Sequence, residues 1–178
     1  MNPLEIIDLY YPEGTKRRHV LITHGQDVAE KALALAHRHP EMELDEAFIQ
    51  EASLLHDIGM FLCDAADIDC YGKASYICHG YLGAELVRQA GYPRHALVCE
   101  RHTGTGLTLS HIIEKRLPIP HRDMVPESLE EQLICFADKF FGKRHLGKEK
   151  SLDRVQAAVA RHGRVGEERF ERWCKLFL

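Results

Sequence analysis

Apolar residues recur along most of the chain three or four residues apart, which is the spacing of amphipathic helices. The one strand-like run, Val20-Leu21-Ile22, is too short to predict a sheet. The pattern therefore predicts an all-α fold, a bundle of at least six helices. With 178 residues and no internal repeat, residues 1–178 are expected to form one domain. Its motif-bearing core covers about residues 20–141, and the C-terminal helices, 151–178, are expected to pack on it.

Capping signals indicate where several of these helices begin. Thr23-His24-Gly25-Gln26 has the form of a capping box and predicts that the first long helix begins at Thr23. Asp45 is expected to cap a second helix that runs to Gly59. A second capping box, Ser128-Leu129-Glu130-Glu131, predicts a helix that runs to about Phe141. Two further helices are predicted over residues 75–90 and 93–102, the latter with Pro93 in its first turn.

Composition narrows the class of protein. A net charge of −4 lacks the basic excess of a general nucleic-acid binder. No apolar leader and no run long enough to span a membrane is present, so we expect a cytoplasmic protein with no membrane partner. The six scattered cysteines form no CxxC pair and are expected to be reduced thiols. Oligomer formation remains possible. The unusual feature is the content of twelve histidines, which directs attention to metal binding.

Six histidine and aspartate residues lie on, or next to, the inward faces of the predicted helices. His56, for example, follows Ala52 by four residues and Ile49 by seven, so it shares their apolar face. Any one such histidine could simply bond to a backbone carbonyl in the core. Together, however, buried imidazoles and carboxylates need partners, and a metal satisfies all of them at once. Nitrogen and oxygen ligands without thiolate suit Fe, Mn, Ni or Zn. The set is His24, His56, Asp57, His79, His102 and Asp138.

The order of these residues resembles the H…HD…H…H…D pattern of HD-domain proteins, with Leu54-Leu55-His56-Asp57-Ile58-Gly59 as the variant in which Ile-Gly follows HD. The resemblance covers roughly residues 24–139 and implies an HD-type helical bundle with a metal site between its central helices. It further implies that His24, His56, Asp57 and Asp138 bind one divalent metal. In members with two further histidines, here His79 and His102, Asp57 bridges to a second metal. We therefore expect two metal ions; the alternative is one ion, with His79 and His102 contacting substrate phosphate.

The segment from Thr103 to Pro126 is expected to be a long excursion over one face of the domain. Its glycines follow one candidate ligand and its prolines precede the helix of another, so it is a candidate lid; a rigid surface excursion is the alternative. The segment lacks the Gly-Tyr-Pro signature of cyclic-di-GMP phosphodiesterases after Gly106. The chain looks more like the small single-domain members of the superfamily, which include enzymes that hydrolyse dinucleoside polyphosphates.

The predicted activity is metal-dependent hydrolysis of a phosphate ester or anhydride in a small phosphorylated metabolite, with a nucleotide as the expected class. Asp57, as the shared ligand, and Lys139, near the leaving oxygen, are the predicted catalytic residues. Arg18, Thr103 and Arg144 are the predicted substrate contacts, although both arginines could instead be solvated at helix ends. The same ligands also fit a mixed-valent diiron oxygenase of the HD superfamily. A third alternative is a nucleotide-binding sensor without catalysis.

Overall fold

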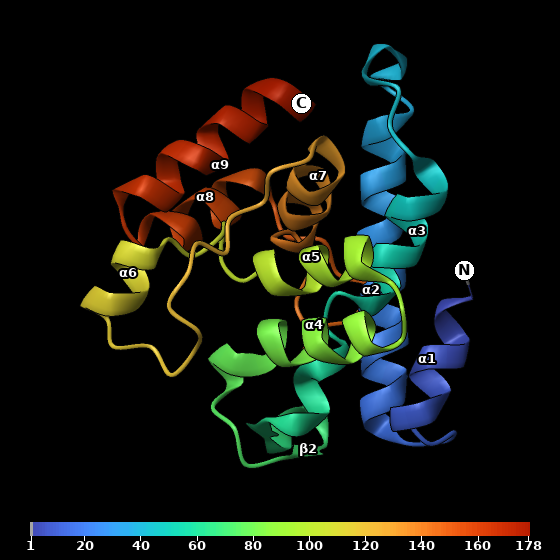
Figure 1. Ribbon diagram of the computed structural model, residues 1–178. Coiled ribbons are helices and arrows are strands. Elements are labelled where there is room, and N and C mark those ends of the chain that lie inside the picture. The colour runs from blue at the N-terminus through green and yellow to red at the C-terminus, as the bar shows by residue number, and fades with distance from the viewer. Residues whose placement is uncertain (1) are drawn as a thin grey trace.

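A computed structural model describes residues 2–178 and confirms an all-α fold (Figure 1). Within that range there are nine α-helices and four short 3-10 turns. One two-residue hairpin pairs Asp64 with Tyr71 and Ala65 with Cys70 in antiparallel register. The α-helices are α1 (Pro3–Tyr10), α2 (Lys16–Ala36), α3 (Glu46–Leu55), α4 (His79–Gln89), α5 (Pro93–Arg101), α6 (Leu109–Glu114), α7 (Leu129–Asp138), α8 (Leu152–Ala160) and α9 (Arg164–Phe177). The shorter elements are η1 (Pro40–Met42), η2 (Ile58–Leu62), β1 (Asp64–Ala65), η3 (Ala66–Ile68), β2 (Cys70–Tyr71) and η4 (Tyr76–Cys78).

Local capping chemistry decides several helix starts as the sequence predicts. The Asp45 carboxylate accepts from the Phe48 amide at 3.0 Å, and the Ser128 hydroxyl accepts from the Glu131 amide at 3.1 Å. Pro93 is in the first turn of α5. Side-chain caps thus start α3 and α7, and Pro93 starts α5; each of the three helices ends at or just before a candidate ligand.

Several helix boundaries differ from the prediction. The first long helix begins at Lys16, capped by the Thr15 side chain, and not at Thr23. Thr23 lies inside the helix, because Val20 and Leu21 extend its buried face toward the N-terminus. The predicted helix over residues 45–59 ends as an α-helix at Leu55, and a 3-10 turn follows. Similarly, α7 ends at Asp138 rather than near Phe141, and α1 was not predicted at all.

The described residues form two large apolar clusters and a third, smaller one that includes Ile112 of α6. One cluster joins α2, α3 and α7 to the C-terminal helices, where Phe170, Trp173 and Phe177 are buried. The other large cluster joins α1 and the start of α2 to η2, α4 and α5. In Figure 1, α4 and α5 cross the middle of the molecule, α2 runs along one side with α1 and α3, and α6, α8 and α9 lie on the other. This arrangement lets five elements point side chains into one central region.

Glycines allow the backbones around that region to approach closely. A Cβ atom on Gly59 would lie 2.2 Å from the His79 carbonyl oxygen and 2.4 Å from the Gly83 amide nitrogen. A Cβ atom on Gly80 would lie 2.8 Å from the Cys99 carbonyl oxygen. The 3-10 turn after Asp57 therefore packs directly on α4, and α4 packs on α5, without side chains in between.

The excursion over residues 103–126 is anchored at its base. Leu107 and Met124 exchange backbone hydrogen bonds of 2.8 Å, and Ile112, which lies on α6 within the excursion, is buried. From α9, the Arg169 guanidinium donates to the Thr105 carbonyl at 2.8 Å. The Thr105 hydroxyl donates to the Gly166 carbonyl at 3.3 Å. The excursion thus connects the C-terminal helices to the turn that follows α5.

Across residues 2–178, none of the helices combines the length and the apolar character that crossing a membrane requires.

Candidate metal centre

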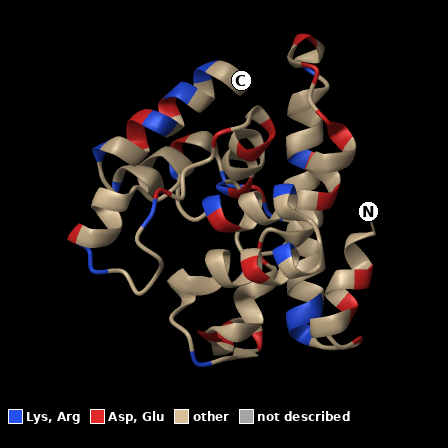
Figure 2. Cartoon of the chain, viewed as in Figure 1, with Lys and Arg blue, Asp and Glu red and all other residues tan. Residues whose placement is uncertain are grey.

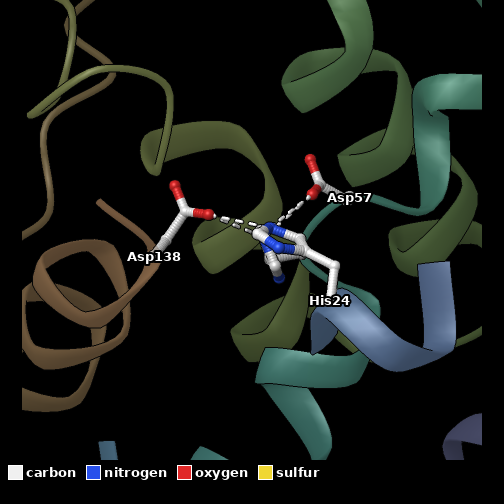
Figure 3. A group of neighbouring side chains, drawn as sticks. His24, Asp57 and Asp138 are labelled. Carbon is white, nitrogen blue, oxygen red and sulfur yellow. Dashed lines mark hydrogen bonds and ion pairs between the residues drawn. The ribbon is translucent and has the colours of Figure 1, made fainter. Parts of the chain in front are cut away.

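The six candidate ligands come from five places in the fold and meet in its interior. His24 lies in the middle of α2, His56 and Asp57 directly follow α3, and His79 is the first residue of α4. His102 directly follows α5 and Asp138 ends α7. All six are buried, with relative exposures from 0% at Asp57 to 9% at Asp138. Figure 3 shows His24 between the Asp57 and Asp138 carboxylates.

The ligand atoms form two groups that share Asp57. His24, His56, Asp57 and Asp138 offer ligand atoms within 4.8 Å of one another, and so do Asp57, His79 and His102. The two oxygens of Asp57 divide between the groups. Oδ2 is 3.0 Å from His56 Nε2 and 3.3 Å from His24 Nε2. Oδ1 is 3.2 Å from His79 Nε2 and 3.4 Å from His102 Nε2. Asp57 is thus placed where a carboxylate could bridge two cations.

Three of the histidines have their inward nitrogen selected by the same local hydrogen bond. Nδ1 of His56, His79 and His102 donates to the carbonyl three residues earlier, at 2.7, 2.6 and 2.8 Å. The acceptors are the carbonyls of Ser53, Tyr76 and Cys99. Because Nδ1 donates to a carbonyl, Nε2 is the nitrogen that faces the cluster and can offer a lone pair to a metal. Metal-binding histidines ordinarily have their second nitrogen held in this manner.

Several buried atoms of the cluster lack a hydrogen-bond partner, although they lie close to other polar atoms. Both Asp57 oxygens and Nε2 of His56 are in this position, as is Nδ1 of His24. The contacts around Asp57 are instead close approaches of the histidine nitrogens and the Lys143 ammonium. Buried polar atoms without partners are rare in folded proteins unless an ion or water completes them. The nitrogen and oxygen donors present therefore fit one or two divalent transition-metal ions.

The electrostatics of the cluster keep its carboxylates ionised. Burial opposes ionisation, but His56 and Lys143 hold the pKa of Asp57 well below its ordinary value. Burial likewise opposes ionisation of Asp138, whose pKa is held well below its ordinary value by Lys139 and His24. Burial lowers the pKa of His102 to about 4, so this imidazole is neutral, as a metal ligand must be. At His56 burial also acts to lower the pKa, but Asp57 and Asp138 raise it to about 9. A metal bound at His56 would therefore displace a proton.

Two lysines accompany the ligands, one of them not anticipated from the sequence. The Lys139 ammonium is 2.7 Å from Asp138 Oδ2 and donates to the His102 carbonyl at 3.1 Å. The Lys143 ammonium is 2.6 Å from Asp57 Oδ2. The sequence predicts Arg144 as a contact instead of Lys143. Both residues follow α7, where no helical periodicity indicates which side chain faces the core. The signal that was available is the position of Lys143, five residues after Asp138, in a segment that begins at the ligand.

The predicted substrate contacts are placed very differently from one another. Thr103 lines the cavity described below. Arg18 is 2.7 Å from Asp8 and donates to the Tyr11 carbonyl, so it is held against the chain around α1. Arg144 is largely exposed and is 2.5 Å from Asp67. Neither arginine lines the cavity, because nearby carboxylates on other elements bind them. Of the three predicted contacts, only Thr103 lies on the cavity wall.

A cavity of about 1140 Å³ opens directly on the cluster. His79, His102 and Asp138 form part of its wall, and the excursion and the C-terminal helices form the rest. Among its described lining residues are seven basic side chains and only two acidic ones, Glu114 and Asp138. Acidic and basic residues are otherwise interspersed over the helices (Figure 2), so this positive lining is a local feature. The basic residues are Lys115, Lys139, Lys143, Lys150, Arg161, Arg164 and Arg169.

Comparison with known protein families agrees with this geometry. The sequence model of the HD-domain family matches residues 21–143, which is more than half of the chain. This chain belongs to the HD-domain family. The match includes all six candidate ligands and ends at Lys143, so α8 and α9, which complete the cavity wall, lie outside it. HD domains are in general metal-dependent phosphohydrolases, and the His/Asp cluster of this member could hold such metals.

Three curated relatives show how far the likeness extends. An uncharacterised protein of Methanocaldococcus jannaschii is 35% identical over 146 residues, which are 80% of this chain and 79% of that protein. Proteins named tRNA (cytidine(56)-2′-O)-methyltransferase from Thermoplasma volcanium and Picrophilus torridus are 29% and 31% identical. Those alignments cover 83% and 75% of this chain but only 39% and 35% of the two relatives. No solved structure gives a significant match.

The number of metal ions can be tested on the second ligand group. Protein loaded with excess Mn is expected to retain about two ions per chain, because Asp57 presents one oxygen to each group. The double variant His79→Ala/His102→Ala should retain about one, since the group around His24 is untouched. Elemental analysis after removal of free metal gives the answer. His111→Ala, a cavity histidine outside both groups, is the control and should match the wild type. Saturation of the wild type at one ion would contradict the prediction.

Proposed function

We propose that this protein hydrolyses a phosphate ester or anhydride in a small phosphorylated metabolite, with a nucleotide as the expected class. The observation that carries the proposal is the cavity: it begins at the ligand cluster and is lined by seven basic and two acidic residues. The whole chain has a net charge of −4, so a positive cavity is not a consequence of overall composition. A concave site with convergent cations beside metal ligands is suited to a phosphorylated substrate.

In this proposal the two ligand groups each hold a divalent cation. His24, His56, Asp57 and Asp138 would hold one, and Asp57, His79 and His102 would hold the other. Bound there, the cations would offset the negative charge of phosphate oxygens and lower the pKa of a bound water from about 15.7 toward about 7. Asp57 links the two ligand groups, since one of its oxygens faces each group. The carbonyl-bound Nδ1 atoms keep the imidazoles oriented.

Side chains of the chain itself would orient the substrate and assist the leaving group. Water adds to phosphorus while the bond from phosphorus to the leaving oxygen breaks, and that oxygen takes up a proton. The Lys139 ammonium has three donors, of which two are directed to Asp138 and the His102 carbonyl. The third is suited to the phosphate or to the leaving oxygen. The Thr103 side chain lies on the cavity wall beside His102, where it can donate to the same group.

The names of the two longer relatives bear on the choice of substrates. They are named as enzymes that act on tRNA, and this chain aligns with only about two fifths or less of their length. A cluster of histidine and aspartate ligands beside a cation-lined cavity supports hydrolysis better than methyl transfer, which requires no such ligand set. Cytidine nucleotides and a short RNA nevertheless belong in the substrate panel alongside other nucleotides and sugar phosphates.

The experiment that tests the proposal separates hydrolysis from oxygenation. Protein stripped of metal is loaded with Mn in one sample and Fe in another, and phosphate release over the panel is measured under argon and under air. Hydrolysis needs only a Lewis acid and water, so we expect release by the Mn-loaded protein under argon. Asp57→Ala, prepared identically, controls for contaminating phosphatases. Activity that requires both iron and oxygen would favour the diiron oxygenase. No turnover together with tight nucleotide binding would favour the sensor.

A further inference from the structure

Lys143 approaches the ligand cluster from the cavity side. It lies beyond the end of α7, and its ammonium is turned back to within 2.6 Å of Asp57 Oδ2. The side chain is 18% exposed and lines the cavity. Its ammonium is 5.9 Å from the centroid of the Tyr76 ring, and that ring stacks on His79 with centroids 4.6 Å apart. Lys143 therefore contacts the one carboxylate that both ligand groups share.

The contact has an electrostatic consequence for metal binding. The two buried carboxylates of the cluster each have an ammonium beside them: Lys139 at Asp138, and Lys143 at Asp57. A buried carboxylate is costly without a cation nearby, so Lys143 compensates Asp57. A divalent cation bound to Asp57 would supply that compensation itself and would repel the ammonium a few ångströms away. Asp57 Oδ2 therefore cannot bind the metal ion and the Lys143 ammonium equally well at the same time.

The cavity is the space into which the displaced ammonium can move. Lys143 has a flexible four-carbon stem, and it lines the cavity together with Tyr76, His79 and Asp138. Lys139, in contrast, is tied to the His102 carbonyl as well as to Asp138. Of the two lysines beside the ligands, Lys143 has no backbone acceptor holding it in place within the described chain. It is the one that can change partner.

We propose that Lys143 couples metal loading to phosphate binding: its ammonium neutralises Asp57 in the protein stripped of metal, and bound metal displaces it into the cavity, where it binds the phosphate group of the substrate. The inference rests on the proposed function only in taking phosphate as the group that enters the cavity. Under this coupling, the metal-loaded protein gains a cation for phosphate that the stripped protein does not offer.

Binding measurements on the whole chain test both halves of the coupling. Calorimetric titration of Mn into stripped protein, and of inorganic phosphate into Mn-loaded protein freed of excess metal, is carried out on the wild type and on Lys143→Met. The variant should bind Mn about tenfold more tightly, because the competing ammonium is gone, and phosphate about tenfold more weakly. Lys148→Met, an exposed lysine in the same segment that does not line the cavity, should match the wild type. Unchanged or weaker Mn binding by Lys143→Met, or unchanged phosphate binding, would overturn the coupling.

A second measurement uses the wild-type chain, so it does not depend on how the variant folds. Limited acetylation followed by peptide mass spectrometry should find Lys143 protected in stripped protein and reactive after Mn loading, with Lys148 as the internal reference. Equal reactivity of Lys143 in the two states would overturn the displacement. Neither measurement uses turnover. A protein that shows the coupling but hydrolyses nothing would refute the proposed function alone, and a hydrolase whose Lys143 stays protected would refute the coupling alone.

Discussion

Replacing Asp57 by alanine is expected to leave the chain unable to retain metal and without phosphate release. Asp57 is the only member common to both ligand groups, it is fully buried, and each of its oxygens faces one group. Loss of an outer-shell partner typically lowers metal affinity 10- to 100-fold, so loss of this shared ligand should cost more than about 100-fold. Elemental analysis and Mn titration after dialysis provide the measurement.

Two companion variants distinguish loss of the ligand from loss of the fold. Asp57→Asn keeps the shape of the side chain but removes its charge, and it should also fail to hold two ions, since a neutral amide cannot bridge two cations well. Asp64→Ala removes an exposed carboxylate from β1 and should bind metal like the wild type. If Asp57→Ala folds and retains the wild-type metal content, the centre has been placed on the wrong residues.

Replacing Gly59 by alanine is expected to be among the most destabilising single-methyl additions in the chain. The added Cβ would lie 2.2 Å from the His79 carbonyl oxygen and 2.4 Å from the Gly83 amide nitrogen, and both are backbone atoms that cannot rotate away. Overpacking of this kind typically costs about 1–3 kcal/mol, and contact with backbone on both sides predicts about 3 kcal/mol or more. Urea or thermal denaturation of metal-free protein measures the loss.

The same substitution should affect the second ligand group more than the first. Relief of the clash requires α4 to move away from η2, and α4 begins with His79. Metal analysis of Gly59→Ala is therefore expected to show a loss of bound metal that is larger than partial unfolding alone would cause. Gly142→Ala is the matched control, because its Cβ would meet only the end of the Lys150 side chain, at 3.7 Å. It should change the free energy of unfolding by no more than about 0.5 kcal/mol. Equal stability of the two variants would refute the packing argument.

Much of this protein could be inferred from local sequence, because the relevant forces act within a few residues. Helical periodicity reports which side of a helix faces the core. It predicts that His24, His56, His79, His102 and Asp138 face inward, and all five are buried. Capping is equally local: the Asp45 and Ser128 side chains bond to amides three residues later. The all-α fold follows from the same periodicity, whereas the HD-type membership rests on the resemblance in the order of the histidines and aspartates; both are confirmed.

The tertiary structure decided what depends on distant partners. Arg18 and Arg144 are bound by Asp8 and Asp67, so charge close to a ligand in sequence did not become charge in the cavity. Lys143 is turned toward Asp57 by the path of the chain after α7, which no periodicity describes. Periodicity specifies a face of one helix but not which other element packs on it. The packing partners are decided by contacts between distant elements, such as the close approach of η2, α4 and α5. For the same reason, only the folded chain shows which cations reach the site.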